Sequence, residues 1–211
     1  MLNFARFRKS ASAQTQLPSE VIAPELPKIP PQFIRTIRLP FFDAVALAQC
    51  DLTVDGREPA FALAFISPHL DFRTAAQQIK SRLPGATKFV ATSTAGELSI
   101  DPSANGPALY CSADGMWSTV IIQLFSAEMI ADVSLHTVRL FSEDIRAGQP
   151  TRSIDERVDL LRRELARVKP AFNLDPTQTF ALTLIDGLSA SESFLMEAVH
   201  RDGRFPCLFV G

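Results

Sequence analysis

The spacing of apolar residues predicts alternating short strands and helices from about residue 39 onward. Residues 60–66 form an almost unbroken apolar run, typical of an inner strand covered on both faces. Residues 71–83 instead repeat apolar side chains every three or four positions and run into Pro84-Gly85, which predicts a helix that ends there. Residues 87–92 form the next strand. This strand, helix, strand order favours parallel pairing with a right-handed crossover.

The second half of the chain repeats these signals. Residues 153–168 open with the capping box Ser153-Ile154-Asp155-Glu156 and carry an apolar stripe, so they predict the clearest helix. The other expected elements are a helix over 41–51, antiparallel neighbouring strands over 117–125 and 133–141, a strand over 179–185, a helix over 190–200 with a second capping-box pattern from Ser189 to Glu192, and a last strand from Cys207. The sequence therefore predicts an α/β or α+β fold: a mixed, partly parallel sheet of about five or six strands, flanked by helices.

The first 32 residues read as a segment outside this fold. Residues 10–32 are rich in Ser, Ala, Gln and Pro, and their prolines disrupt helices. The first ten residues, with Phe4, Phe7 and three cations, predict either a frayed terminus or a short amphipathic contact for a partner or an anionic membrane. We expect a disordered Pro-rich leader over 1–32 and one domain over 33–211.

Two polar segments follow predicted strands, where ligands usually bind in open α/β sheets. In Ser93-Thr94-Ala95-Gly96-Glu97, Ser93 and Thr94 offer hydroxyls, Gly96 permits close backbone approach, and Glu97 offers a carboxylate for an amine or guanidinium. The alternative is a tight turn with Glu97 in solvent.

The second segment, Asp186-Gly187-Leu188-Ser189, connects a predicted strand to a predicted helix, and the first N–H groups of that helix favour an anion. The alternative is local: Ser189 and Glu192 start the helix while Asp186 holds the turn. If both segments border one cavity, a ligand with an amine and a carboxylate, such as an amino acid, would suit it. Ligand-binding candidates are thus Ser93, Thr94, Gly96, Glu97, Asp186, Gly187 and Ser189.

In order and separation, four blocks resemble the N-terminal FIST domain. They are Phe65-Ile66-Ser67-Pro68, Leu83-Pro84-Gly85-Ala86, Ser93-Thr94-Ala95-Gly96-Glu97 and the run from Phe180 to Ser189. The resemblance spans roughly residues 40–211. It implies a cytoplasmic sensory domain of bacterial signal transduction, which binds a small molecule and signals to a partner such as a histidine kinase or diguanylate cyclase.

The chain departs from that family pattern in two places. Ala91-Thr92 stands where the family usually has Gly-Cys, which removes the thiol at that point. The chain also stops at Gly211, inside a Pro-x-x-Gly-Gly-Ser-Ala-Gly-Asp block, so we expect a truncated domain whose native chain continues.

Haem is a second ligand that the resemblance implies, because some relatives are haem proteins that sense nitric oxide. Iron needs an axial ligand, commonly His or Cys, in an apolar pocket. The candidates are His69, His136, His200, Cys111 and Cys207, and none lies in a haem-attachment motif. His69, which follows Ser67-Pro68 at a strand end, is the best placed; a plain surface histidine is the alternative.

Composition excludes several other classes of protein. A net charge of −2 argues against a surface that binds nucleic acid. The sequence contains no run of 18 apolar residues, so we expect no stable membrane insertion. Three cysteines without a Cys-x-x-Cys pair favour a reducing compartment, the cytoplasm. Gly187-Leu188-Ser189-Ala190-Ser191 approaches a nucleophile elbow but lacks its second glycine, so a serine hydrolase is the weaker alternative. An interaction scaffold without a ligand is the third possibility.

Overall fold

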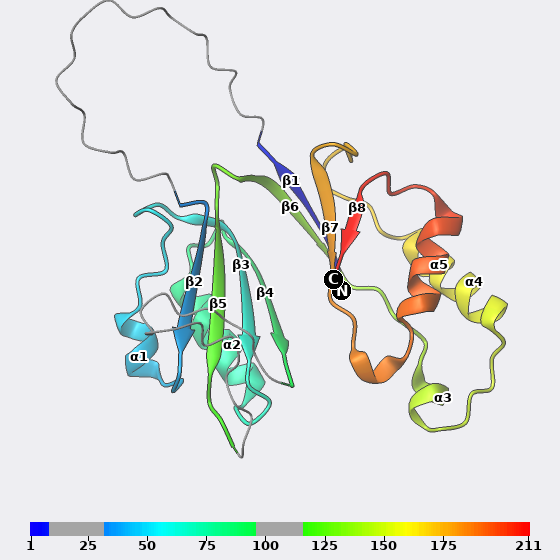
Figure 1. Ribbon diagram of the computed structural model, residues 1–211, viewed down its shortest axis with the longest axis horizontal. Helices are drawn as coiled ribbons and strands as arrows, with labels where there is room; N and C mark the ends of the chain where they lie inside the picture. Colours follow the sequence, from blue (N-terminus) through cyan, green and yellow to red (C-terminus); the bar gives the residue numbers. More distant parts are fainter. Residues whose placement is uncertain (9–31, 96–115) are drawn as a thin grey trace, which may run out of the picture. The chain divides into compact units, whose positions relative to one another are not determined.

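The computed structural model describes residues 1–8, 32–95 and 116–211. The chain forms two compact units (Figure 1). The terminal unit combines Met1–Arg8 with Ile130–Gly211, and the central unit is Lys9–Met129. In the described ranges each unit holds a four-stranded sheet, so two small sheets replace the single larger one expected. Parallel and antiparallel pairs occur in both, with helices beside them, which confirms the α+β class.

The central unit is built around a βαβ crossover. Its sheet has the order β2 (Ile34–Leu39), β5 (Val120–Ser126), β3 (Pro59–Ile66) and β4 (Lys88–Ser93). Strands β3 and β4 are parallel and joined by α2 (Phe72–Arg82), as the sequence predicts. The helix before β3, α1 (Ala44–Gln49), begins later than expected because Asp43 caps it, accepting from the Ala46 amide at 2.6 Å. The buried core of this unit includes Ile66, Ile79 and Ile122.

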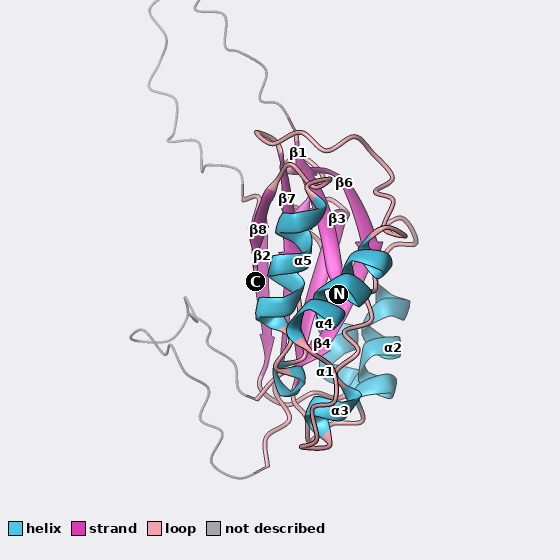
Figure 2. Ribbon diagram, turned by 90° about the vertical axis from the view of Figure 1, so that its right-hand side faces the viewer, coloured by secondary structure: helices cyan, strands magenta, loops and turns pink. Residues whose placement is uncertain are grey.

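The terminal unit has a mixed sheet covered by two helices. The sheet order is β6 (Ile130–His136), β1 (Leu2–Phe7), β7 (Thr179–Thr183) and β8 (Leu208–Val210). Strand β1 is antiparallel to both neighbours, whereas β8 is parallel to β7. The helices α4 (Ile154–Leu165) and α5 (Glu192–Asp202) lie over this sheet (Figure 2). They supply Leu161 and Leu195 to a core shared with Leu2 and Phe4.

The expectation that residues 1–32 stay outside the fold is wrong for the first strand. Leu2 and Phe4 are fully buried, and β1 lies between β6 and β7. The run Leu-Asn-Phe-Ala-Arg-Phe carries the alternation that places Leu2 and Phe4 on one face of a strand. Residues 9–31, which hold the Pro-rich part of the expected leader, lie outside the described residues.

The expected antiparallel pairing of the strands over 117–125 and 133–141 is also wrong. Strand β5 pairs with β2 and β3, and β6 pairs with β1. The physical reason is that β1 and β2, two strands that the sequence analysis missed, pair with β6 and β5 instead. Strand β6 ends at His136, which leaves residues 137–142 as a connection to the short helix α3 (Glu143–Arg146).

Candidate functional site

A cavity of about 350 Å³ lies in the terminal unit, where β6 and β7 end. Both strands are antiparallel to β1, so they run in the same direction and their carboxyl ends reach the same edge of the sheet. We call this the edge cavity. It is lined by Met1, Val138, Arg139, Leu140, Phe141, Ser142, Glu143, Arg146, Leu184 and Asp186.

Four charged side chains at the edge cavity form two ion pairs. Arg146 contacts Asp186 Oδ2, and Arg139 Nη2 lies 2.7 Å from Glu143 Oε1. The hydrogen bond from Arg139 holds the pKa of Glu143 below its usual range, so Glu143 is an anion at neutral pH. All four side chains are roughly half exposed, between 46% and 65%. Pairs this exposed contribute little to stability, so the charged groups of a ligand can replace either partner.

The segment after β7 holds Asp186 in a tight turn. Its Oδ1 accepts from the Leu188 amide at 2.9 Å, while Oδ2 faces Arg146. A short 3₁₀ turn, η1 (Gly187–Ser189), follows. The predicted capping box of Ser189 and Glu192 is wrong, because Ala190 adopts a left-handed conformation (φ 47°) and separates Ser189 from the helix. Helix α5 begins at Glu192, after Ser191.

Ser189 shows little of the geometry that a nucleophile needs. Its side chain is fully buried, and its Oγ has no hydrogen-bond partner, so no base holds it. Ser191 donates its hydroxyl to the Ser189 carbonyl at 2.8 Å. This arrangement gives the serine hydrolase alternative no support.

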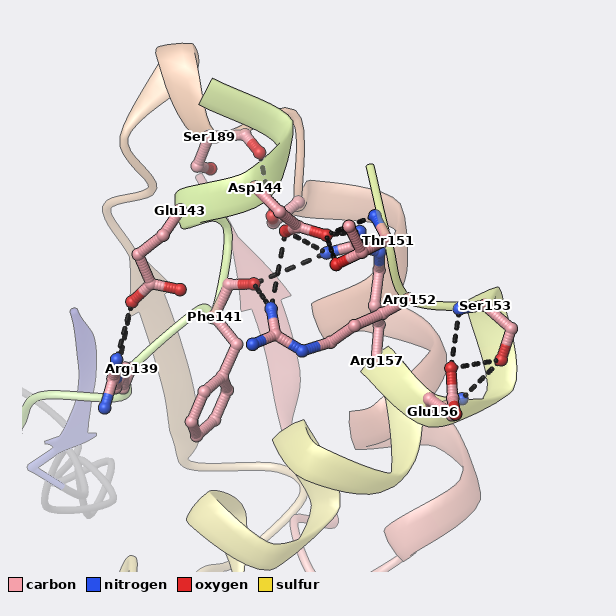
Figure 3. A network of polar contacts seen from close by, with 11 residues as sticks. Arg139, Phe141, Glu143, Asp144, Thr151, Arg152, Ser153, Glu156, Arg157 and Ser189 are labelled. Atoms are coloured by element: carbon pink, nitrogen blue, oxygen red, sulfur yellow. Dashed lines mark hydrogen bonds and ion pairs between the residues drawn. The ribbon is translucent and has the colours of Figure 1, made fainter. Parts of the chain in front are cut away.

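The opposite wall of the edge cavity is α3, which a buried ion pair fastens to α4 (Figure 3). Arg157 of α4 donates from Nη2 to Asp144 Oδ2 at 2.6 Å and from Nη1 to Oδ1 at 3.0 Å. The Thr151 amide and hydroxyl also donate to Oδ2, at 2.8 and 3.1 Å. The hydrogen bond from Arg157 above all holds the pKa of Asp144 far below its usual range. The two parallel hydrogen bonds between Arg157 and Asp144, which we call the fork, thus hold in place the helix that carries Glu143 and Arg146.

The first turn of α4 supports this fork. Ser153 Oγ accepts from the Glu156 amide at 3.3 Å, and the Ser153 amide donates to Glu156 Oε2 at 2.7 Å. The capping box that the sequence predicts is therefore confirmed. It fixes the start of the helix at Ile154, and its Glu156 directly precedes Arg157 (Figure 3).

The structure distributes the predicted ligand-binding residues over both units. Asp186 lines the edge cavity, and Gly187 and Ser189 follow it in η1. Ser93 ends β4 in the central unit, and the Thr94 amide donates to Ile66 O at 3.3 Å, at the carboxyl ends of β3 and β4. Gly96 and Glu97 lie outside the described residues. A cavity shared by the two segments stays a prediction.

A haem ligand stays a prediction. His69 is exposed on a turn, and its ring lies edge-to-face with that of Trp117, with 4.5 Å between the ring centroids. The His136 ring is hydrogen-bonded to the Ser134 hydroxyl at 2.8 Å. Burial lowers the pKa of His136. No described histidine or cysteine lines the edge cavity or the two further cavities found, one in each unit. Cys111 lies outside the described residues.

The described residues hold no group of three His, Cys, Asp or Glu side chains arranged to bind a metal ion. Within residues 1–8, 32–95 and 116–211, none of the helices is long and apolar enough to span a bilayer.

Sequence reasoning missed three charged residues of the edge cavity: Arg139, Glu143 and Arg146. They belong to no motif, and Arg139 lies in a stretch expected to be strand. The only signal was a cluster of charges after an apolar run. Asp186 was found because it follows a strand that the apolar pattern predicts.

Comparison with known proteins places the chain in a family. No curated protein and no solved structure shows significant similarity to it. The model of the FIST N domain family, however, matches residues 60–211, which contain every residue of the edge cavity except Met1. FIST is a sensory domain family and not an enzyme family. With most of its length covered by this match, the chain belongs to the FIST N domain family.

Proposed function

We propose that the terminal unit is the ligand-sensing part of a cytoplasmic bacterial signalling protein. The edge cavity then binds a small molecule with both an amine and a carboxylate, an amino acid or a similar compound. The observation that carries this proposal is the exposed pair of Arg146 and Asp186, which joins the segments after β6 and β7 at the cavity. The sensory character of the family supports it.

The charges of the cavity match such a ligand. The guanidinium of Arg146 offers a planar donor pair for a carboxylate, and the carboxylate of Asp186 accepts from an ammonium group. Arg139 and Glu143 provide a second pair of the same kind. Val138 and Leu184 supply apolar surface for the rest of the ligand. A ligand with both charges leaves neither Arg146 nor Asp186 without a partner.

The proposed output is a shift in conformational population that a signalling partner reads. A ligand that prefers one conformation raises the population of that conformation in proportion to its differential affinity. A histidine kinase or a diguanylate cyclase is the partner that this proposal names.

The test is a thermal-shift screen of the twenty amino acids, small carboxylic acids and haem. A ligand at about 100 times its Kd stabilises the folded state by about 2.7 kcal/mol, which raises the melting midpoint measurably. We expect at least one zwitterion to do so with the wild type and to lose its effect with Arg146→Gln and with Asp186→Asn. Arg162→Gln is the matched control, because Arg162 pairs with Asp159 on α4 and lines no cavity described here.

Four outcomes would overturn this proposal. A screen in which no compound raises the midpoint removes the small ligand, and an undiminished response of Arg146→Gln removes the edge cavity as its site. A Soret band in the purified protein, lost in one His→Ala variant, replaces the zwitterion with haem. If the amount of partner bound in a pull-down is unchanged by Asp186→Asn and by every compound, the scaffold alternative is favoured.

A further inference from the structure

The wall of the edge cavity formed by α3 is fixed by buried contacts. Asp144 receives hydrogen bonds from Arg157 and Thr151, and Arg157 is only 4% exposed. Arg152 and Arg157 both donate to the Phe141 carbonyl, at 3.1 and 3.4 Å, just before α3 begins. Breaking Arg146 away from Asp186 leaves all of these contacts intact.

The other wall, residues 186–191, is poorly satisfied in its described conformation. Ser189 buries a hydroxyl that has no partner, which is unfavourable. Ala190 occupies the left-handed region, which favours glycine. Ser191 is the residue before α5, but its side chain makes no capping hydrogen bond, and its hydroxyl donates to the Ser189 carbonyl.

These three features are consecutive in sequence, so one backbone change acts on all of them. Rotation of Ala190 out of the left-handed region relieves its strain and moves Ser189 and Ser191 relative to each other. Ser191 Oγ can then turn toward the Phe194 amide and accept from it, as serine does at the start of most helices it caps.

We propose that residues 186–191 are a two-state segment that Arg146 holds in the described conformation. A ligand that engages Arg146 releases Asp186, the segment rearranges, and the change reaches the first turn of α5. This inference rests on the proposed ligand site. The direction of the signal follows from the two walls, because α3 stays attached to α4 through Asp144 and Arg157.

Amide hydrogen exchange of the ligand-free chain tests this switch. Arg146→Gln removes the ion pair as a ligand would. We expect exchange of the Leu188 amide, now bonded to Asp186, to become about fivefold faster, the size of effect that an exposed pair exerts. The Phe194 amide should become about fivefold slower as Ser191 caps α5. The Ala147 amide, bonded to Glu143 in α3, should keep its rate.

Two substitutions at Ala190 provide matched variants of opposite direction. Ala190→Gly removes the cost of the left-handed conformation, so Leu188 should exchange more slowly than in the wild type. Ala190→Pro cannot adopt a positive φ, so it should reproduce the Arg146→Gln pattern with Arg146 intact. If Ala190→Pro does not fold, Ala190→Gly combined with Arg146→Gln is the second variant, in which Leu188 should exchange more slowly than in Arg146→Gln alone.

Several results would overturn the switch. Faster exchange at both Leu188 and Phe194 means simple loosening, faster exchange at Ala147 means that α3 is the moving wall, and unchanged rates mean that there is no second conformation. The exchange experiment uses no ligand, so a negative result there overturns the switch and does not affect the proposed ligand site. A negative ligand screen overturns the ligand site and does not affect the exchange pattern.

Discussion

Two aspartate and arginine pairs in the terminal unit share their chemistry but differ in burial. Arg157 and Asp144 are 4% and 13% exposed, and their two parallel hydrogen bonds form a fork. Arg146 and Asp186 are 48% and 46% exposed. Water screens the second pair and barely reaches the first, so their energies differ although their charges are the same.

The difference assigns separate roles to the two pairs. Removing one partner of a buried pair leaves an uncompensated charge in a medium that solvates it poorly, so such a pair holds its elements together. An exposed pair costs little to open, so its groups remain available to a ligand. The buried pair therefore sets the position of α3, and the exposed pair recognises the ligand.

The largest expected effect is on stability, from loss of the buried guanidinium. Arg157→Met keeps most of the side-chain volume but leaves Asp144 without its fork. We expect the free energy of unfolding to fall clearly in urea denaturation, although Arg152 and Thr151 still contact Asp144. Arg162→Met, at an exposed pair on the same helix, should change it by less than about 0.5 kcal/mol. Equal losses in the two variants would break the comparison.

The acid dependence of stability is the next expected difference. The fold lowers the pKa of Asp144, so its contribution is present above the unfolded pKa of about 3.9 and is lost as the pH falls from about 5. The free energy of unfolding should therefore decline less steeply below about pH 5 in Arg157→Met and in Asp144→Asn. Glu143, whose pKa is lowered mainly by the hydrogen bond from Arg139, keeps its share of the decline, and Glu156 keeps most of its share because the bonds with Ser153 are the main cause of its lowered pKa. Identical slopes in wild type and both variants would contradict this role of Asp144.

At the edge cavity, a much smaller stability change than that of Arg157→Met is expected from the exposed pair of Arg146 and Asp186. Arg146→Gln should alter the free energy of unfolding by less than about 1 kcal/mol, because both partners remain hydrated. The same variant should abolish the thermal shift given by the zwitterion. A loss of stability as large as that of Arg157→Met would show that Arg146 is a structural residue.

Local patterns predicted the elements whose signals lie within one segment. The apolar stripe and capping box gave α4, and two apolar runs around an amphipathic helix gave the β3, α2, β4 unit. Strand β1 was missed because a Pro-rich stretch follows it, and its partner β7 lies almost the full chain length away. No local pattern records such long-range pairing.

The candidate site was only half predictable for the same reason. Asp186 follows an apolar strand, so its place at a sheet edge could be anticipated. Arg139 and Arg146 reach the cavity only because β6 pairs with β1, which brings the end of β6 to the edge where β7 ends. The wrong pairing of β6 with β5 hid this arrangement. The start of α5 was misplaced because the left-handed conformation of Ala190 leaves no sequence signature.

The most direct test of the ligand site is an amide NMR titration of the full chain with the amino acid that gives the largest thermal shift. We predict that the perturbed amides centre on residues 139–146 and 184–188, on both walls of the edge cavity, and that Arg146→Gln abolishes them. Perturbations at Ser93 and Thr94 as well would support the shared cavity that the sequence predicts. Perturbations confined to the central unit, with residues 184–188 unchanged, would contradict the assignment of the edge cavity as the ligand site.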